Sequence, residues 1–495
     1  MADRRPGIAR NKPGTVLSLA RYRRVVSSHM SENLLRRTAE YAISYLAGLD
    51  ERPVGKPVDV ESMRRALGGD LPEDGQPADQ VLANLVEDGD PGIVATSGPR
   101  YFGFVIGGTL PVALAADWMT STWDQNAGLY VISPANSVAE ETAGTWLAEL
   151  FGLPVGVSVG FVTGCQAANF SGLAAARHFL LDRAGWDVER KGLYGAPEIQ
   201  MVLGDEAHVT IHTGLQMLGL GGERVHRVPV DGQGRMLVAE LKKVLANLAG
   251  KPILICAQAG NVNTGAFDPI DEIADLAEEF DAWLHIDGAF GLWANASPDL
   301  QHLVSGIGRA DSWATDGHKW LNVPYDSGLV FCKHPQAHRS ALTAQASYLQ
   351  QTEGKERDPF EWTPEFSRRA RGFAVWAALK YLGRSGVRDL IERTCAHARR
   401  FADLLGEAPG VEILNEVVLN QALVRFSPSP DAEDADKDEF TRVVIRRVQE
   451  DGTCWLSGTA WQGKAAMRIS VCNWSTMQED VDKSAEAILR AVNFG

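Results

Sequence analysis

Short apolar runs alternate with longer amphipathic stretches from about residue 100 onward, and this alternation predicts an α/β domain. The apolar runs that we interpret as strands lie at residues 199–203, 253–257, 282–286, 312–315 and 328–332. The intervals between most of these runs are long enough to hold helical crossovers. This pattern is typical of a mostly parallel sheet whose strands are joined by helices.

The two ends of the chain have a different pattern. Near the N-terminus, residues 31–49 carry apolar side chains at helical spacing, and Ser31 is a suitable N-cap. A helical run begins near Arg368, a second covers 387–405, and strands and helices alternate after them; the acidic stretch 431–439 is predicted to be a solvated loop. The predicted domains are an N-terminal helical segment (1–100), a large domain (101–370) and a smaller α+β domain (371–495).

The composition is that of a globular protein, with 45% apolar and 22% charged residues among 495. Lys and Arg number 48 and Asp and Glu 63, and the net charge of −15 disfavours nucleic acid and anionic membrane surfaces as partners. The sequence shows neither an apolar run long enough for a transmembrane helix nor the pattern of a secretory signal. Six scattered cysteines without a CxxC pair argue against structural zinc and disulfides, and predict a cytoplasmic protein.

The segment TDGHKWLNVPYDSG, residues 315–328, carries the strongest chemical signal. Lys319 follows a predicted strand and lies between His318 and Trp320. Most lysines are surface residues, and that interpretation stays open. A lysine flanked by aromatic rings at a strand end can instead be desolvated, which lowers the pKa of its amine toward the nucleophilic range.

A second signal is Asp287 in HIDGAFGLW, at the end of an apolar strand. A carboxylate is costly there unless it meets a cation or several donors. It either caps the following helix or holds a protonated ring nitrogen or a metal. No second carboxylate or histidine stands at metal-ligand spacing from Asp287, and we therefore expect no metal site.

Two more segments combine a strand end with a polar or glycine-rich turn. In FVTGCQAANFSGLAAARH a strand, a glycine turn and a helix rich in small residues follow one another, and N–H groups at such a helix start bind anions. In LGDEAHVTIHTG, His208 follows a strand end. A lone histidine is more often structural than catalytic, but its flat ring can also stack on a flat cofactor.

Together these four features match the needs of one cofactor. Pyridoxal 5'-phosphate (PLP) requires a lysine for covalent attachment, an acid for its pyridine nitrogen, a phosphate-binding turn and a cover for its ring. The chain offers them in the order turn, His208, Asp287 and Lys319, each at a predicted strand end. The conjunction is far more specific than any single member.

The chain resembles the PLP-dependent amino-acid decarboxylases related to aromatic-L-amino-acid and glutamate decarboxylases, from PRYFGF to the C-terminal AAMRISVCNWST. The resemblance implies an aspartate-aminotransferase-like fold, with a mostly parallel sheet in the large domain and a smaller α+β C-terminal domain. It implies that Lys319 attaches the cofactor, that Asp287 pairs with the pyridine nitrogen and that His208 stacks over the ring. The other cofactor contacts that it implies are Gly164, Cys165, Gln166, Ala167, Ala289 and His318.

The resemblance extends to residues that would act on the substrate. Tyr348, in ASYLQQTEGKERD, matches the catalytic tyrosine of a mobile loop, where aldehyde-forming relatives have phenylalanine. Arg468, in AMRISV, resembles the arginine that meets the substrate carboxylate in glutamate decarboxylases. From the residues alone, Tyr348 could equally be a packed aromatic and Arg468 part of a structural ion pair. Phe102 and Phe104 in PRYFGF would suit an aromatic substrate and slightly favour one.

Two departures from the family pattern stand out. The family commonly has Asn-Pro before the His-Lys pair, whereas this chain has Asp316 and Gly317. A carboxylate near a phosphate dianion would repel it, so Asp316 is expected to point elsewhere or to meet a cation. A threonine pair of the family is replaced by Asn261 and Val262, although Asp268 in AFDP matches.

Several alternatives share parts of this pattern. GTAWQGKA, residues 458–465, fits GxxxxGK, but Ala465 replaces the required hydroxyl residue and a strand follows, so nucleotide hydrolysis is rejected. An acidic amino-acid decarboxylase, an oxidative decarboxylase that forms an aldehyde, an aldolase-type lyase and a transaminase would use the same cofactor pocket. The sequence predicts a carboxy-lyase that forms an amine from an L-amino acid, and the resemblance implies a homodimer.

Overall fold

The computed structural model describes residues 28–343 and 356–493, and the chain divides into two compact units. One unit contains the described residues up to Arg52 together with Pro57–Val94. The other contains Pro53–Lys56 and everything described from Ala95 onward. Both the predicted large domain and the predicted small domain lie in this second unit. None of the described helices combines the length and hydropathy that crossing a bilayer requires.

The N-terminal unit is helical, as predicted. Its helices are α2 (Ser28–Ala47), α3 (Val60–Leu67), α4 (Ala78–Gly89) and the short η1 (Asp90–Gly92). The prediction of Ser31 as N-cap is wrong, because the helix already begins at Ser28 and the apolar spacing carries no information about the polar residues before it. Asp59 caps α3 by accepting hydrogen bonds from the backbone N–H groups of Glu61 and Ser62.

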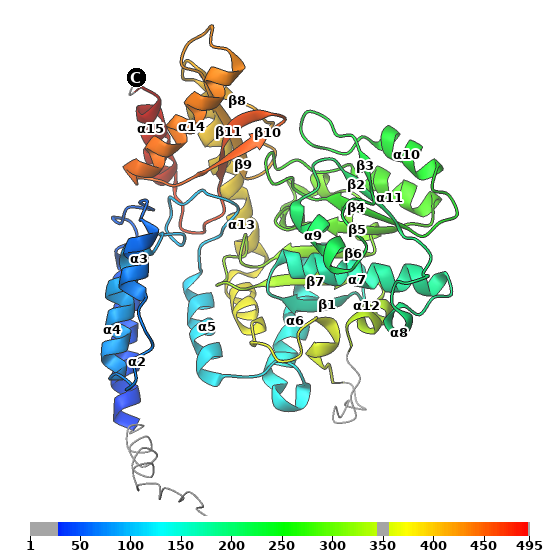
Figure 1. Ribbon diagram of the computed structural model, residues 1–495, viewed down its shortest axis with the longest axis horizontal. Helices are drawn as coiled ribbons and strands as arrows, with labels where there is room; N and C mark the ends of the chain where they lie inside the picture. Colours follow the sequence, from blue (N-terminus) through cyan, green and yellow to red (C-terminus); the bar gives the residue numbers. More distant parts are fainter. Residues whose placement is uncertain (1–27, 344–355, 494–495) are drawn as a thin grey trace, which may run out of the picture. The chain divides into compact units, whose positions relative to one another are not determined.

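A seven-stranded sheet forms the centre of the second unit, in the order β1-β7-β6-β5-β4-β2-β3 (Figure 1). The strands are β1 (Ser158–Val162), β2 (Gln200–Gly204), β3 (Val225–Val228), β4 (Ile253–Gln258), β5 (Trp283–Asp287), β6 (Ser312–Asp316) and β7 (Gly328–Cys332). All pairs from β3 to β6 are parallel, whereas β7 runs antiparallel to both β6 and β1. The predicted mostly parallel sheet is confirmed.

Helices cover both faces of this sheet. Successive side chains of a strand point to opposite faces, and apolar side chains point to both faces here, so both need to be covered. On β4, Leu254 and Cys256 belong to the cluster beneath α7, whereas Ile253 and Ile255 face the cluster that includes α11. The helices of this region are α5 (Pro111–Trp123), α6 (Pro134–Leu150), α7 (Cys165–Arg183), α8 (Val188–Lys191), α9 (Val209–Met217), α10 (Val238–Ala246), α11 (Ile270–Glu279) and α12 (Pro335–Leu342). Short turns of 3₁₀-helix are η2 (Tyr130–Ile132), η3 (Gly291–Ala296), η4 (Gln301–Val304), η5 (Ile307–Arg309) and η6 (Pro359–Trp362).

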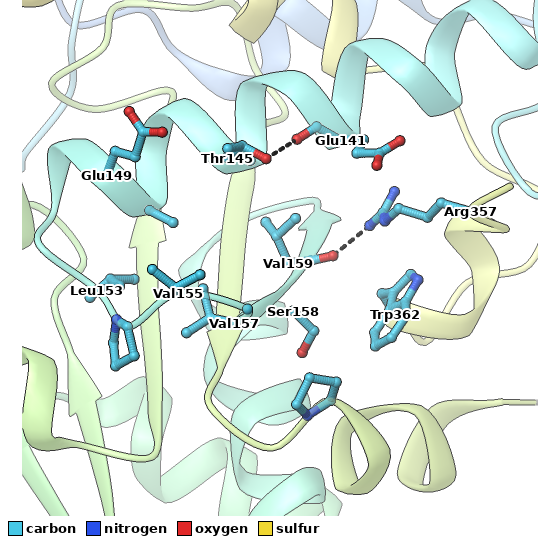
Figure 2. Close-up of a pocket in the computed structure, with 15 residues that line it drawn as sticks. Glu141, Thr145, Glu149, Leu153, Val155, Val157, Ser158, Val159, Arg357 and Trp362 are labelled. Carbon is cyan, nitrogen blue, oxygen red and sulfur yellow. Dashed lines mark hydrogen bonds between the residues drawn. The ribbon is translucent and has the colours of Figure 1, made fainter. Parts of the chain in front are cut away.

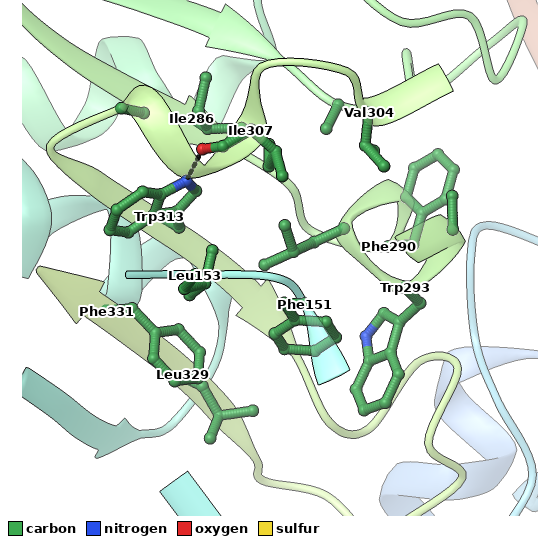
Figure 3. Packing of buried hydrophobic residues seen from close by; sticks show 14 of the residues in the cluster. Phe151, Leu153, Ile286, Phe290, Trp293, Val304, Ile307, Trp313, Leu329 and Phe331 are labelled. Carbon is green, nitrogen blue, oxygen red and sulfur yellow. Dashed lines mark hydrogen bonds between the residues drawn. The ribbon is translucent and has the colours of Figure 1, made fainter. Parts of the chain in front are cut away.

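Large aromatic side chains fill the core under the central strands, as Figure 3 shows. The ring of Phe151 packs edge to face against Trp293, with 4.9 Å between ring centroids. The indole of Trp313 is fully buried and donates to the carbonyl oxygen of Ile307 at 2.9 Å. This core fixes β5 and β6, the strands that lead into Asp287 and Lys319.

The C-terminal part has a second, antiparallel sheet in the order β10-β11-β9-β8 (Figure 1). Its elements are α13 (Gly372–Gly406), β8 (Val411–Ile413), β9 (Gln421–Phe426), α14 (Asp434–Asp451), β10 (Ser457–Trp461), β11 (Lys464–Ser470) and α15 (Gln478–Asn493). The two helices predicted from Arg368 onward join into α13 across a break at Gly383, whose φ is +60°. The GxxxxGK segment is the β10–β11 hairpin, as its rejection as a nucleotide-binding loop requires.

The predicted solvated loop at 431–439 is wrong in its second half, because α14 already begins at Asp434. Arg425 on β9 is 2% exposed and donates to the carboxylates of both Asp434 and Asp438. Two acidic residues of the first two helical turns therefore pair with a buried cation, and Asp434 in the first turn also interacts favourably with the helix dipole.

Candidate active site

Residues predicted from separate motifs meet at the carboxyl ends of β5 and β6 and the start of α7. Asp287 ends β5, Lys319 follows β6, and the turn at Gly164 connects β1 to α7. His208 precedes α9, and Arg468 lies on β11 of the second sheet. Open α/β sheets bind ligands at this edge, where the loops after successive strands lie side by side.

Lys319 is directed into the protein rather than toward solvent. Its Nζ lies 3.0 Å from Oδ2 of Asp316, and its side chain is 20% exposed. Gly107 passes so close to the Lys319 carbonyl group that a Cβ at position 107 would lie 1.8 Å from that oxygen. The interpretation of Lys319 as a surface lysine is therefore wrong.

The predicted lowering of the Lys319 pKa is also wrong. Burial lowers the pKa of this amine, but the nearby acidic groups Asp316, Cys165 and Asp287, with Asp316 the strongest of them, together outweigh burial and raise the pKa above its ordinary value. The sequence left two options for Asp316, to point away from the phosphate or to meet a cation. In the structure it meets a cation, Lys319. In this arrangement Lys319 is an ammonium group held in place by an ion pair.

Asp287 lies in a network of polar side chains from β5, α7 and β6. Its Oδ2 accepts a hydrogen bond from Nδ2 of Asn169 at 3.2 Å, and its Oδ1 accepts from the backbone N–H of Ala289 at 3.2 Å. Asn169 Oδ1 lies 2.9 Å from Nε2 of His285, whose Nδ1 lies 2.8 Å from the Ser312 hydroxyl. Asp287 is 4% exposed and contacts no cation among the described residues, so it has the capacity to hold one.

The turn at the start of α7 is tightly packed against β7. A Cβ on Gly328 would lie 2.5 Å from the Cα of Gly164, and a Cβ on Gly164 would lie 3.2 Å from Cε1 of His318. The N–H of Cys165 donates to Oδ1 of Asp316 at 2.6 Å. Gln166 is exposed and Ala167 is half-buried at the helix start. The turn therefore brings backbone donors within reach of an anion beside Lys319.

The two predicted cofactor histidines are both held by the backbone. Nδ1 of His318 accepts from the N–H of Ser327 at 3.1 Å, and its ring stacks on Tyr325 with 4.2 Å between centroids. His208 caps α9, where its Nδ1 accepts from the N–H of Thr210. Burial lowers the pKa of both imidazoles. Both rings are therefore neutral at physiological pH and carry a proton on Nε2.

Arg468 is a buried cation without an acidic partner among the described residues. It is 8% exposed, and its Nη1 donates to the carbonyl oxygen of Val262 at 3.1 Å and to Oδ1 of Asn263 at 3.3 Å. Its Nε has no hydrogen-bond partner, and burial lowers the pKa of its guanidinium. The alternative of a structural ion pair is therefore wrong for the described part of the chain. Neutral oxygens hold Arg468 and leave its charge available.

The two predicted substrate phenylalanines differ in their surroundings. Phe102 is 1% exposed and packs edge to face against Phe401 in the core of the C-terminal part. Phe104 is 53% exposed and stacks on Trp455. The ring of Phe102 is therefore part of the core, whereas the ring of Phe104 is accessible to solvent. Tyr348 lies outside the described residues.

Sequence reasoning missed several residues that hold the site together. Asn169 links Asp287 to His285, and it also donates to the Thr210 hydroxyl beside His208. The alternation of a strand could have revealed His285, because it precedes Asp287 by two residues and shares its face. The only sequence evidence for a role of Asn169 in the site was its position one helical turn after Cys165. Across the described ranges, no three His, Cys, Asp or Glu side chains gather as a metal site.

The contacts fit PLP at all but one position. The site offers a buried lysine for the aldehyde of PLP and, for its pyridine nitrogen, a carboxylate that meets no cation among the described residues. It also offers backbone donors at a helix start for the phosphate, and two neutral imidazoles for the phosphate and the ring. Ala289 and Ala167 border a cluster of small apolar side chains between α7 and the sheet, where larger residues would crowd a ring. The exception is Asp316, whose carboxylate already accepts hydrogen bonds from donors that would suit a phosphate.

A separate cavity of about 400 Å³ lies at the beginning of β1, whereas the site lies beyond the end of this strand (Figure 2). Glu141 and Arg357 border it, and the guanidinium of Arg357 donates to the carbonyl oxygen of Val159. None of the residues predicted for the cofactor or substrate lines this cavity.

Known proteins are similar to nearly the whole chain. The pyridoxal-dependent decarboxylase conserved domain matches residues 61–427. An aromatic-L-amino-acid decarboxylase of Bacillus atrophaeus is 27% identical over 462 residues, which cover 92% of this chain and 94% of the relative. The acidic amino acid decarboxylase of Mus musculus is 29% identical over 437 residues, covering 85% and 78% respectively. The crystal structure of Oryza sativa TDC with PLP and tryptamine has the same fold, with a TM-score of 0.88 at 22% identity over 94% of this chain and 98% of that one.

Proposed function

The chain belongs to the pyridoxal-dependent decarboxylase family and is a PLP-dependent carboxy-lyase that acts on amino acids, and on this basis we propose that the edge of the sheet around Lys319 is its active site. The observation that carries the proposal is the placement of the charged groups: Asp287 ends β5, Lys319 follows β6 with its Nζ 3.0 Å from Asp316, and the first N–H of α7 donates to the same carboxylate. Lys319 attaches the cofactor, and the α7 turn with His318 binds its phosphate.

Bound PLP supplies an electron sink for the negative charge left on the substrate α-carbon when CO2 departs. Asp287 keeps the pyridine nitrogen protonated and so deepens that sink, while Asn169 fixes the carboxylate in place. His208 covers the ring, since its cap contact with α9 orients the imidazole. Together these residues bind and orient; they add no redox chemistry of their own.

The role of Asp287 is tested by Asp287→Asn, which keeps the shape and removes the charge. Loss of a charge-assisted hydrogen bond costs about 1.5–3 kcal/mol, so we expect kcat to fall by at least about 10- to 100-fold. Near-native kcat in this variant would contradict the assignment. Cys256→Ser, on the neighbouring strand β4, is a matched control and should keep kcat close to that of the wild type.

The substrate is proposed to be an aromatic L-amino acid. Arg468 can bind a carboxylate through charge-assisted hydrogen bonds, because neutral groups alone hold it. Phe104, Trp455 and Tyr325 offer aromatic surface in the same unit, and Tyr325 stacks directly on His318. An acidic amino acid is the second candidate, since the same guanidinium could bind its side-chain carboxylate.

Incubation with the twenty amino acids and common aromatic derivatives separates the two candidates. Release of CO2 and amine from aromatic substrates, with glutamate and aspartate inactive, supports the proposal. Turnover confined to the acidic amino acids would replace the aromatic assignment. A transaminase or an aldolase-type lyase would instead release a keto acid or an aldehyde without CO2.

We further propose that Tyr348 protonates the α-carbon after CO2 has left, so that the product is the amine. A phenol on a loop that closes over the site can act as a general acid while water is excluded. Tyr348→Phe should then shift the product toward the aldehyde, with oxygen consumption. Equal slowing of all products would mean that Tyr348 only packs the loop.

The protein is proposed to be a cytoplasmic homodimer. All six cysteines lie in the described part of the chain and are free, which suits a reducing compartment. Large apolar side chains are exposed along α5 and η2, among them Trp118, Trp123 and Val131, and such surfaces favour association. Light scattering after size exclusion should give a dimer, and a monomer alone at micromolar concentration would contradict this proposal.

A further inference from the structure

Asp316 places a carboxylate among the donors proposed for the cofactor phosphate. Its Oδ1 accepts from the N–H of Cys165 at 2.6 Å and lies 3.5 Å from Nε2 of His318. Its Oδ2 lies 3.0 Å from Nζ of Lys319, and the side chain is 3% exposed. A phosphate bound at the α7 turn would therefore compete with this carboxylate for the same groups.

The charges around Asp316 do not balance a phosphate dianion. An ionised Asp316 and a dianion carry three negative charges between them. Lys319 supplies one positive charge, and His318 supplies a donor but no charge because burial lowers the pKa of its imidazole. The other titratable groups with an electrostatic effect at this position are Cys165, His208 and Tyr325, and none is a cation at neutral pH.

Two buried acidic groups that share donors relieve their repulsion by sharing a proton. A protonated carboxyl group has one O–H donor and one carbonyl acceptor, as an asparagine amide has N–H donors and a carbonyl acceptor. The family commonly has asparagine at this position. A protonated Asp316 could therefore accept from the Cys165 N–H and also donate to the phosphate.

We propose that Asp316 binds the cofactor phosphate through one shared proton, which the site takes up from solvent as the cofactor binds. Only the bond to this proton forms, and no electrons are transferred. Cofactor binding is then coupled to pH by Asp316 itself. The proposal rests on the proposed cofactor roles of the α7 turn, His318 and Lys319.

The phosphorus NMR spectrum of the PLP-loaded protein tests the shared proton directly. The second ionisation of a phosphate ester occurs near about pH 6 in water, and the chemical shift follows it. In the wild type the resonance should shift with pH as the shared proton is lost, whereas in Asp316→Asn, whose amide has no proton to lose, it should stay constant once the phosphate is a dianion. A wild-type resonance that does not shift with pH, or an equal shift in both proteins, would overturn the proposal.

Binding of pyridoxamine 5'-phosphate gives a second readout that leaves the Lys319 amine free. Between about pH 6, above which Asp316 and the free phosphate are both ionised, and the pH at which the complex loses the shared proton, binding takes up one proton. In this range the wild-type Kd should rise with pH about tenfold per unit more steeply than that of Asp316→Asn. Pyridoxamine without phosphate should show no such difference, and equal slopes for the phosphorylated probe would contradict the proposal.

Three further outcomes keep the result decisive. If Asp316→Asn does not fold, the wild-type pH series decides alone, since a resonance that does not shift with pH excludes a shared proton. If neither protein holds PLP although both fold, the proposed cofactor site is wrong and the shared proton falls with it. If PLP binds to both and only the pH dependence is missing, the site stands and the shared proton alone is wrong.

Discussion

Two regions of the second unit bury charged side chains, but they pair them in opposite ways. Glu140 on α6 accepts both guanidinium N–H groups of Arg368 at 2.8 Å, and Arg357 lies 3.2 Å from it. Burial raises the pKa of Glu140, but Arg368 and Arg357 outweigh burial and hold it below its usual value. Arg468, by contrast, donates only to neutral oxygens within the described part of the chain.

The difference separates a structural charge cluster from a binding site. A buried ion pair that is complete within the chain stabilises one fold and has little left for a ligand. A buried guanidinium that meets no carboxylate is desolvated without a compensating ion pair. Its charge is therefore available to a carboxylate of a ligand. The same reasoning applies to Asp287, whose carboxylate is surrounded by donors and meets no cation among the described residues.

Replacing Lys319, the proposed attachment lysine, should give the largest effect on the binding side of this comparison. In Lys319→Ala we expect no turnover and no visible absorbance band with added PLP, because the amine proposed to attach the cofactor is removed. The far-ultraviolet circular dichroism should be unchanged. Lys333, exposed at the end of β7, is the matched control, and Lys333→Ala should be fully active. Residual turnover in Lys319→Ala would place the attachment elsewhere.

The structural cluster should respond in stability instead. Glu140→Gln leaves two buried arginines without their counter-charge, and we expect the free energy of unfolding to fall by about 3–5 kcal/mol in a denaturant titration. Glu149, which pairs with Arg384 on the surface, provides the control, since Glu149→Gln should cost less than about 1 kcal/mol. Equal losses in the two variants would show that the buried cluster is no more important than a surface pair.

Arg468 and Arg425 sharpen the comparison within one sheet. Arg468→Gln should raise KM by about 10- to 100-fold with unchanged PLP affinity, since a charge-assisted bond to the substrate is lost. Arg425, which is paired with Asp434 and Asp438, should behave in the opposite way. For Arg425→Gln we expect lower stability and an unchanged KM. A normal KM in Arg468→Gln would remove Arg468 from the substrate site.

A pH dependence of stability is expected from His285. Burial lowers its pKa to about 4 from 6.5 in the unfolded chain. The unfolded state therefore binds more protons between these values, so the stabilisation is complete above pH 6.5 and is lost as pH falls toward 4. The loss amounts to about 3 kcal/mol. Because His338, with a pKa of about 3, acts in the same window, His285→Gln should flatten the slope only in part; an unchanged slope would contradict this account.

The sequence predicted the architecture well because strand burial leaves a strong pattern. Each of the five predicted strands appears within one residue of its expected bounds. The reversed direction of β7, which makes it antiparallel to both β6 and β1, was not foreseen, because residue pattern does not encode strand direction. The start of α14 was missed for a different reason: the acidity of 434–439 suggested solvent, and the buried partner Arg425 lies on another element.

Motifs and resemblance singled out Lys319, Asp287, His208 and Arg468, and their roles in the site stay predictions. The family, fold class, cofactor and reaction type are confirmed. The direction of the Lys319 pKa was wrong, because it depends on where the side chain of Asp316 points. Asn169 was missed since its partners, Asp287 and His285, come from a distant strand.

Identification of the lysine that carries the cofactor tests the central claim most directly. Borohydride reduction of the PLP-loaded protein fixes the cofactor to that lysine, and peptide mass spectrometry then locates it. The account predicts one modified peptide, carrying the added mass at Lys319. Modification of a different lysine, or a reduced protein without any cofactor adduct, would contradict it.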